Sequence, residues 1–150
     1  KEDGKFIQAA ELYKSAADKG LLIGYRKYAK LIIKGYALRG DEDDDDIARN
    51  YYKKAADFGE AKDQFEYAEF LSQFFNDESA EERADLYKKA SEQGYVKAFF
   101  GYAECLTNGD GVEKNTDEAR KFYTLSYQKD PNSLTRLVLP RLKDQNLIDF

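Results

Sequence analysis

Four related segments follow one another along this sequence and leave few folds open to it. Each segment places an apolar or aromatic residue directly before a tyrosine, and the four tyrosines are Tyr13, Tyr52, Tyr87 and Tyr123. These tyrosines lie 39, 35 and 36 residues apart. A repeat of that length is typical of a solenoid built from helical hairpins. The chain is therefore expected to be all-α, with stacked antiparallel hairpins.

The spacing inside each segment is that of a helix. In the second copy, small and large residues alternate at i, i+3, i+4, i+7 and i+8, which are Ala48, Tyr51, Tyr52, Ala55 and Ala56. Such spacing places them on one face of a helix. Three copies end in a glycine that tolerates the left-handed turn after a helix: Gly20, Gly59 and Gly94.

Another helix is expected after each of these glycines, because a tyrosine–alanine pair recurs there between apolar or small positions. The pairs are Tyr28-Ala29, Tyr67-Ala68 and Tyr102-Ala103. We call the helix after each glycine the first helix of a hairpin and the helix that follows it the second helix. The chain of 150 residues is expected to be one domain, residues 1–150. Its hairpins would cover about 21–59, 60–94 and 95–130, after a partial unit at about 5–20 that lacks its first helix.

The C-terminal residues 131–150 depart from the repeat. Asp130 and Pro131 form a stop signal. Leu134, Val138 and Leu142 then follow at intervals of four, as in a helix that Pro140 would bend or shorten. We expect this segment to form a terminal cap on the last hairpin.

Composition weakens several classes of function. The chain has no histidine and one cysteine, so it cannot form a Ser-His-Asp triad, a histidine-ligated metal site or an internal disulfide. No metal site, cofactor or small-molecule substrate is expected. A net charge of −5 argues against nucleic acid as the main partner. No apolar run approaches the ~20 residues of a membrane span, and the N-terminal residues do not resemble a signal peptide. Because the sequence holds no pair of cysteines that an oxidising compartment would join in a disulfide, a cytoplasmic location is expected.

The recurring residues resemble the Sel-one-like repeat family (SLR), which is related to the tetratricopeptide repeats. The best match runs from Ala98 to Tyr123 and includes the turn Gly109-Asp110-Gly111-Val112. The resemblance covers about residues 6–130. The family's tryptophan is replaced by Leu12, Tyr51, Leu86 and Phe122, and its small residues by Asp63 and Arg83.

This resemblance implies a right-handed α/α superhelix that acts as an adaptor or scaffold for a protein or peptide partner. In related solenoids the first helices line a concave groove. The matching positions lie three, six, ten and fourteen residues after each turn glycine, and we call them the groove positions. Besides Ile23 they are Arg26, Lys30, Lys34, Lys62, Phe65, Glu69, Gln73, Lys97, Phe100, Glu104 and Asn108. A partner segment could use the charges for register and the phenylalanines as anchors, although packing residues and solvated charges would give the same pattern.

An acidic run stands in the connection after the first complete first helix. It consists of Asp41, Glu42, Asp43, Asp44, Asp45 and Asp46. Adjacent carboxylates repel one another, so an extended, mobile loop is expected. A docking patch for a basic partner, or weak divalent-cation binding, is the functional alternative. The run lacks the glycine and final glutamate of a calcium loop.

Two other classes of function compete with an adaptor. In the first, the chain is a structural subunit or spacer fixed in a larger assembly through its edges, which an apolar patch around Ile7, Leu12 and Leu21 would favour. The second is an enzyme that uses paired carboxylates, for which Asp63 is the candidate; a capping or salt-bridged role of Asp63 is the expectation instead. Cys105 is expected to be a buried small residue, and Gly109 and Gly111 a repeat turn rather than a phosphate loop.

Overall fold

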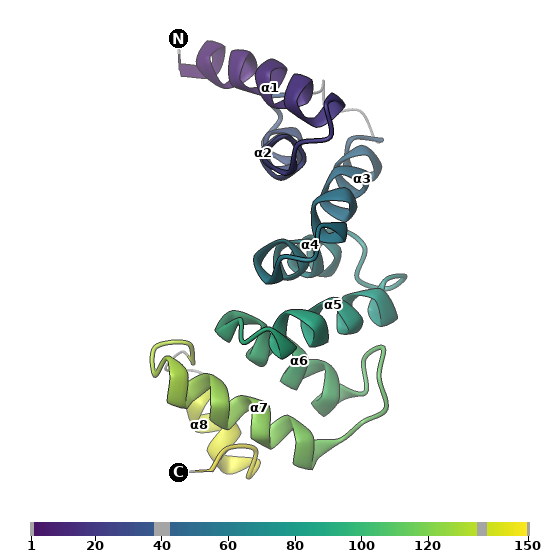
Figure 1. The fold of residues 1–150 in the computed structure, drawn as a ribbon. Coiled ribbons are helices and arrows are strands. Elements are labelled where there is room, and N and C mark those ends of the chain that lie inside the picture. The colour runs from purple at the N-terminus through teal and green to yellow at the C-terminus, as the bar shows by residue number, and fades with distance from the viewer. Residues whose placement is uncertain (1, 38–42, 135–137, 150) are drawn as a thin grey trace. The chain divides into compact units, whose positions relative to one another are not determined.

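The computed structural model describes residues 2–37, 43–134 and 138–149, and within them the chain forms eight helices and no strand (Figure 1). The helices are α1 (Glu2–Asp18), α2 (Leu22–Ile33), α3 (Asp44–Asp57), α4 (Ala61–Phe74), α5 (Ala80–Glu92), α6 (Val96–Asn108), α7 (Thr116–Lys129) and α8 (Val138–Asp144). The all-α expectation is confirmed. The first helices are α2, α4 and α6, and the second helices are α1, α3, α5 and α7.

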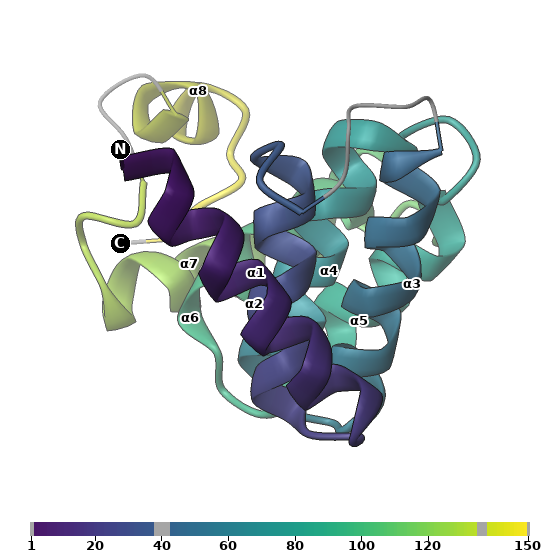
Figure 2. The same ribbon diagram turned by 90° about the horizontal axis from the view of Figure 1, so that it is seen from above.

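The helices are grouped in two compact units, Lys1–Phe70 and Leu71–Phe150, whose boundary falls inside α4. In the first unit α1 packs on α2 and α2 packs on α3; in the second unit α5 packs on α6 and α6 on α7 (Figure 1, Figure 2). In these four pairs each helix packs on its neighbour along the chain, as expected for stacked hairpins. The expectation of one domain over residues 1–150 stays a prediction.

The core follows the register that the repeat predicts. The recurring first-helix positions are all buried: Gly24, Tyr28, Ala29 and Ile32 on α2, Asp63, Tyr67, Ala68 and Leu71 on α4, and Ala98, Tyr102, Ala103 and Leu106 on α6. The small residues let the helix axes approach. At Gly24 an added Cβ would lie 2.1 Å from the backbone nitrogen of Ala17, so α1 and α2 meet backbone to backbone at this point.

Arg83 occupies a position that is small in related repeats, and the second unit accommodates it through hydrogen bonds. Its side chain is buried, and Nη1 donates to the carbonyl oxygen of Asn76 (3.1 Å) and to Asn76 Oδ1 (2.8 Å). Nη2 pairs with the carboxylate of Asp110. Arg83 thus ties the α4–α5 connection to the α6–α7 connection. Asp110 lies between Gly109 and Gly111, both with positive φ, which confirms a structural turn there.

The described part of the acidic run, Asp43 to Asp46, does not form the extended loop that its charge predicts. Asp44, Asp45 and Asp46 form the first turn of α3, and Asp43 is the residue before it. A helix N-terminus attracts carboxylates through its unpaired N–H groups and its dipole, and this attraction outweighs the repulsion between neighbouring acids. Asp41 and Glu42 lie outside the described residues.

The C-terminal segment packs on the last hairpin of the second unit. Leu142, Leu147 and Ile148 are buried. Arg120 Nε of α7 donates to the carbonyl oxygen of Asn146 (2.7 Å), and the backbone nitrogen of Asp149 donates to Thr124 Oγ1 (3.0 Å). The helix in this segment begins at Val138, so proline 140 falls in its first turn, where proline is tolerated.

None of the helices in the described ranges is long and apolar enough to cross a membrane.

Candidate interaction surface

Two groove positions on α2, Arg26 and Lys30, form ion pairs with carboxylates on α4 or directly before it. Arg26 Nε donates to Asp63 Oδ1 (2.7 Å), and Arg26 Nη2 donates to Asp63 Oδ2 (2.6 Å) and to Glu60 Oε2 (2.6 Å). The Asp63 side chain is only 1% exposed. The hydrogen bond to Asp63 is the main cause of an Arg26 pKa well above its ordinary value. The expected salt-bridged role of Asp63 is confirmed.

Lys30 makes a parallel contact one turn further along α2. Its Nζ lies 2.8 Å from Glu66 Oε1 of α4. Arg26 and Lys30 therefore hold two first helices side by side, and their charges are largely neutralised by α4 itself. A partner would meet these two cations as part of a fixed network rather than as independent charges.

The other groove positions differ in exposure. Lys34, Lys62 and Glu69 in the first unit are exposed, as are Gln73, Lys97 and Asn108 in the second. Phe65 and Phe100 are half-buried. Phe100 packs against the ring of Tyr123, with 5.7 Å between ring centroids. Phe100 therefore contributes to the hairpin as well as to the surface.

Glu104 is engaged from two sides within the second unit. The hydroxyl of Tyr123 on α7 donates to Glu104 Oε1, and Arg141 Nη2 of α8 lies 2.6 Å from the same oxygen. Burial and the hydrogen bond to Glu104 both raise the pKa of Tyr123. The C-terminal segment thus contacts one of the groove positions. The contact of Arg141 could not be predicted from the sequence, because no repeat position corresponds to this residue.

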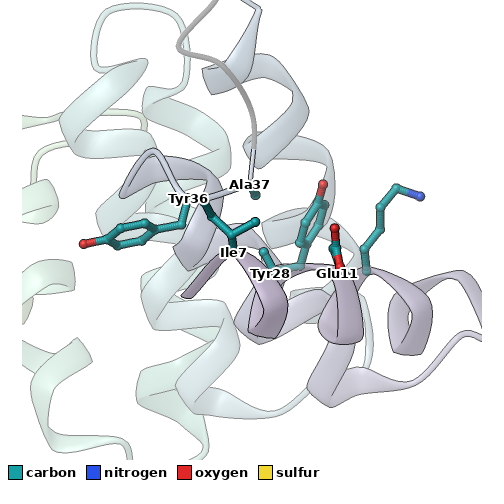
Figure 3. A pocket seen from close by; sticks show the side chains of 7 residues that line it. Ile7, Glu11, Tyr28, Tyr36 and Ala37 are labelled. Carbon is teal, nitrogen blue, oxygen red and sulfur yellow. The ribbon is translucent and has the colours of Figure 1, made fainter. Parts of the chain in front are cut away.

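A pocket of about 140 Å³ lies in the first unit, between α1, α2 and the segment that follows α2 (Figure 3). Ile7 and Glu11 of α1 face Tyr28 of α2 and Ala37 across it. The pocket is large enough for one apolar side chain. The pocket was not predicted from the sequence, although one signal was present: Phe6 and Ile7 occupy the repeat positions at which α3 has Asp45 and Asp46.

Cys105 is buried at 4% exposure, as expected, and burial raises its pKa to about 11. It is therefore a protonated packing residue at neutral pH, not a nucleophile. In the part of the chain that the structure describes, no three aspartate, glutamate or cysteine side chains gather as a metal-binding group.

These features define a helical-repeat scaffold. First and second helices alternate along the chain, small residues lie where helices cross, and the groove positions lie on the first helices. The model of the Sel1 repeat family matches residues 5–21, 27–59, 84–95 and 97–131, which together are more than half of the chain. The chain therefore belongs to the Sel1 repeat family, whose members generally mediate protein–protein interactions.

Solved structures show the same fold. A Sel1 repeat protein from Oxalobacter formigenes aligns with 22% sequence identity and a TM-score of 0.69, over 85% of this chain and 52% of its own. A protective antigen of uropathogenic Escherichia coli strains that displays an SLR fold aligns with 24% identity and a TM-score of 0.70, over 85% of this chain and 27% of its own. The chain thus spans about half of the first of these proteins and a quarter of the second. No curated protein matches the sequence.

Proposed function

We propose that this chain is a non-enzymatic interaction module whose first helices bind a segment of a partner protein. The observation that carries the proposal is two ion pairs, Arg26 with Asp63 and Lys30 with Glu66, which fix α2 against α4 before any partner arrives. A surface that is already ordered loses little conformational entropy on binding. Family membership supports the interaction role.

The exposed groove positions indicate the chemistry of the partner. Lys34, Lys62 and Lys97 are exposed lysines on or directly after first helices. The partner segment is therefore expected to carry carboxylates opposite them. Their exposure makes each pair weak, about 0.2–1 kcal/mol, so several contacts act together and apolar anchors beside Phe65 or Phe100 supply the remainder.

The test compares charge reversals on the two kinds of helix. One double variant, Lys34→Glu and Lys62→Glu, changes the groove positions of the first unit. A single variant, Lys97→Glu, changes a groove position of the second unit, so the two units are tested separately. The matched control reverses Lys53 and Lys88, which are exposed on second helices. Each protein is crosslinked in extract of its source cell and purified, and circular dichroism checks its helicity.

The proposal predicts that a partner captured by the wild type is lost from one or both groove variants and kept by the control. Loss from the control alone, or retention by all variants, contradicts a first-helix site.

A second function is favoured by exposed apolar side chains near the start of the chain. Ile7, Leu12 and Leu21 are 49%, 72% and 50% exposed. This is the pattern expected if the chain is a structural subunit attached to a neighbour through its edge. The Leu12→Asp variant tests it in the same pull-down, where attachment through the edge predicts loss of the neighbour.

A cytoplasmic location is part of the proposal. It is supported by the sequence, which holds one cysteine and so no pair that an oxidising compartment would join. Cell fractionation with an antibody to the protein tests it.

A further inference from the structure

We propose that a pocket beside the α6–α7 connection binds the guanidinium group of an arginine side chain carried by a partner segment. The pocket has a volume of about 340 Å³. It is lined by residues 112–115 of the connection together with Tyr102, Leu106 and Glu118, all in the second unit. We call it the connection pocket. None of its lining residues is a groove position, so the proposal adds a second site and does not depend on the first.

The hairpin of α6 and α7 that forms the connection pocket has neighbours before and after it in the second unit. Its connection meets α5, because an added Cβ at Gly111 would lie 2.1 Å from the carbonyl oxygen of Ala80. The C-terminal segment contacts α7, where Arg120 Nε donates to the carbonyl oxygen of Asn146 (2.7 Å). The pocket therefore belongs to a hairpin inside the stack and is not a face left bare at one end of it.

The connection is held in place without a ligand. The carboxylate of Asp110 pairs with the buried guanidinium of Arg83. The backbone nitrogen of Asn115 donates to the carbonyl oxygen of Leu106 (2.9 Å), and Asn115 Oδ1 accepts from the backbone nitrogen of Glu118 (3.0 Å). A wall fixed in this way loses little conformational entropy when a ligand binds.

Tyr102 lines the connection pocket with a hydroxyl that has no hydrogen-bond partner among the described residues. Tyr102 is 5% exposed, and its ring packs edge-on against Phe122 of α7, with 4.9 Å between centroids. The hydroxyl oxygen is not fully enclosed, because Ser91 Oγ is the one enclosed side-chain polar atom without a partner in the described ranges. Buried tyrosine hydroxyls usually have a partner, so a ligand that supplies one is favoured here.

The charges beside this hydroxyl favour a cation. Glu113 and Glu118 both line the pocket, and Lys114 forms no ion pair with either of them. The Glu118 carboxylate accepts one long hydrogen bond from Asn115 Nδ2 (3.3 Å). Burial and then the charge of Glu118 raise the pKa of Tyr102, so the carboxylate acts on the hydroxyl. A positively charged donor complements these groups, whereas an anion is repelled.

Arginine is the basic side chain that suits this set of acceptors. Its planar guanidinium presents five N–H donors and can meet a phenol oxygen and two carboxylates together, while an ammonium is a compact point charge. Leu106 and Val112 offer apolar atoms to the methylenes of the stem. Glu113 and Lys114 are exposed, so the backbone of the partner segment can stay outside. The volume is at the lower end of the range for ligand sites, about 300–1,000 Å³, which suits one long side chain.

Three probes test the proposal on the 150-residue chain. The first is a capped five-residue peptide of glycine and alanine with one central arginine. The second replaces the arginine by citrulline, which keeps the shape of the side chain and removes its charge. The third is free arginine. Amide NMR shifts of the isotope-labelled chain give the Kd of each probe and locate the contact.

The arginine peptide is expected to bind with a Kd of about 1 mM. It should bind about tenfold tighter than the citrulline peptide, because hydrogen bonds from a charged donor are about twice as strong as neutral ones. The shifts should concentrate in residues 102–118. Equal affinities of the two peptides, or shifts concentrated elsewhere, would overturn the proposal. Tighter binding of free arginine than of the arginine peptide would also overturn it, since the site would then hold a small molecule.

Three variants assign the contact to individual groups. Tyr102→Phe removes the hydroxyl and keeps the ring, and Glu118→Gln removes the charge and keeps a side chain that suits this position of a helix cap. Each should weaken the arginine peptide about fivefold. Glu113→Gln, on the exposed connection, should do the same and keeps the proposal testable if Tyr102→Phe disturbs packing. Glu82→Gln, at the corresponding position of α5, is the control and should bind as the wild type does. Wild-type affinity in all three pocket variants would contradict the proposal.

Discussion

Buried charge is the main departure from a simple repeat at the scale of the residue. Asp63 and Arg83 stand where the repeat pattern expects small residues, and each is buried with a partner of opposite charge. The sequence analysis foresaw a salt bridge for Asp63 but could not identify Arg26 as its partner. Residues 37 positions apart meet only once α2 and α4 are aligned, and several cations stood at comparable register positions.

Replacement of Arg26 by leucine should leave the Asp63 carboxylate buried without its principal partner. Breaking a buried pair from one side costs about 3 kcal/mol, and urea denaturation should show a loss of that size in the free energy of unfolding. Lys14→Leu is the control, because Lys14 and Asp18 form an exposed pair within α1 and its loss should change stability little. Equal effects of the two variants would contradict a structural role for the Arg26–Asp63 pair.

The thiol of Cys105 should make stability fall in mild base. Burial raises its pKa from 9.0 to about 11, so between these values the unfolded chain loses the proton while the folded chain keeps it. The unfolded state then binds fewer protons, and stability decreases as pH rises, by about 2 kcal/mol for this group. Urea titrations at pH 9 and pH 11 should show a smaller decrease for Cys105→Ala than for the wild type. Identical decreases would show that the thiol ionises as readily when folded.

At the scale of the element, hydrophobic period and turn glycines were sufficient to predict every first and second helix. These two signals did not predict features that depend on a helix terminus or on how two helices cross. Repulsion between Asp44, Asp45 and Asp46 predicts an extended loop, but these residues form the first turn of α3, where the helix N-terminus attracts their carboxylates. The pocket beside Ile7 depends on how α1 crosses α2 and on the chain after α2, and sequence spacing within one helix does not contain that information.

The approach of α1 to α2 depends on Gly24. An alanine there would place its Cβ 2.1 Å from the backbone of α1, so the helices must separate. We expect Gly24→Ala to lower the free energy of unfolding by about 3 kcal/mol, the upper range for overpacking. Gly4→Ala is the matched control, since an added Cβ at Gly4 on α1 meets nothing within 4 Å. Chemical denaturation of both variants measures this change. An unchanged free energy of unfolding for Gly24→Ala would contradict close backbone contact between α1 and α2.

At the scale of the whole molecule, the repeat determines the fold but not which surface is used. The family and the two solved structures establish the hairpin architecture. The proposed function depends on residues that vary between repeats. These are the lysines at groove positions and the ion pairs that fix α2 against α4.

Lysine footprinting of the crosslinked complex tests the central claim most directly. The complex and the free chain are treated with an amine-acetylating reagent, and modification at each lysine is quantified by mass spectrometry. A first-helix interaction surface predicts protection of Lys34, Lys62 or Lys97 in the complex, while Lys53 and Lys88 on the second helices react as in the free chain. Protection of Lys53 and Lys88 with full reactivity at the three groove lysines would contradict the account.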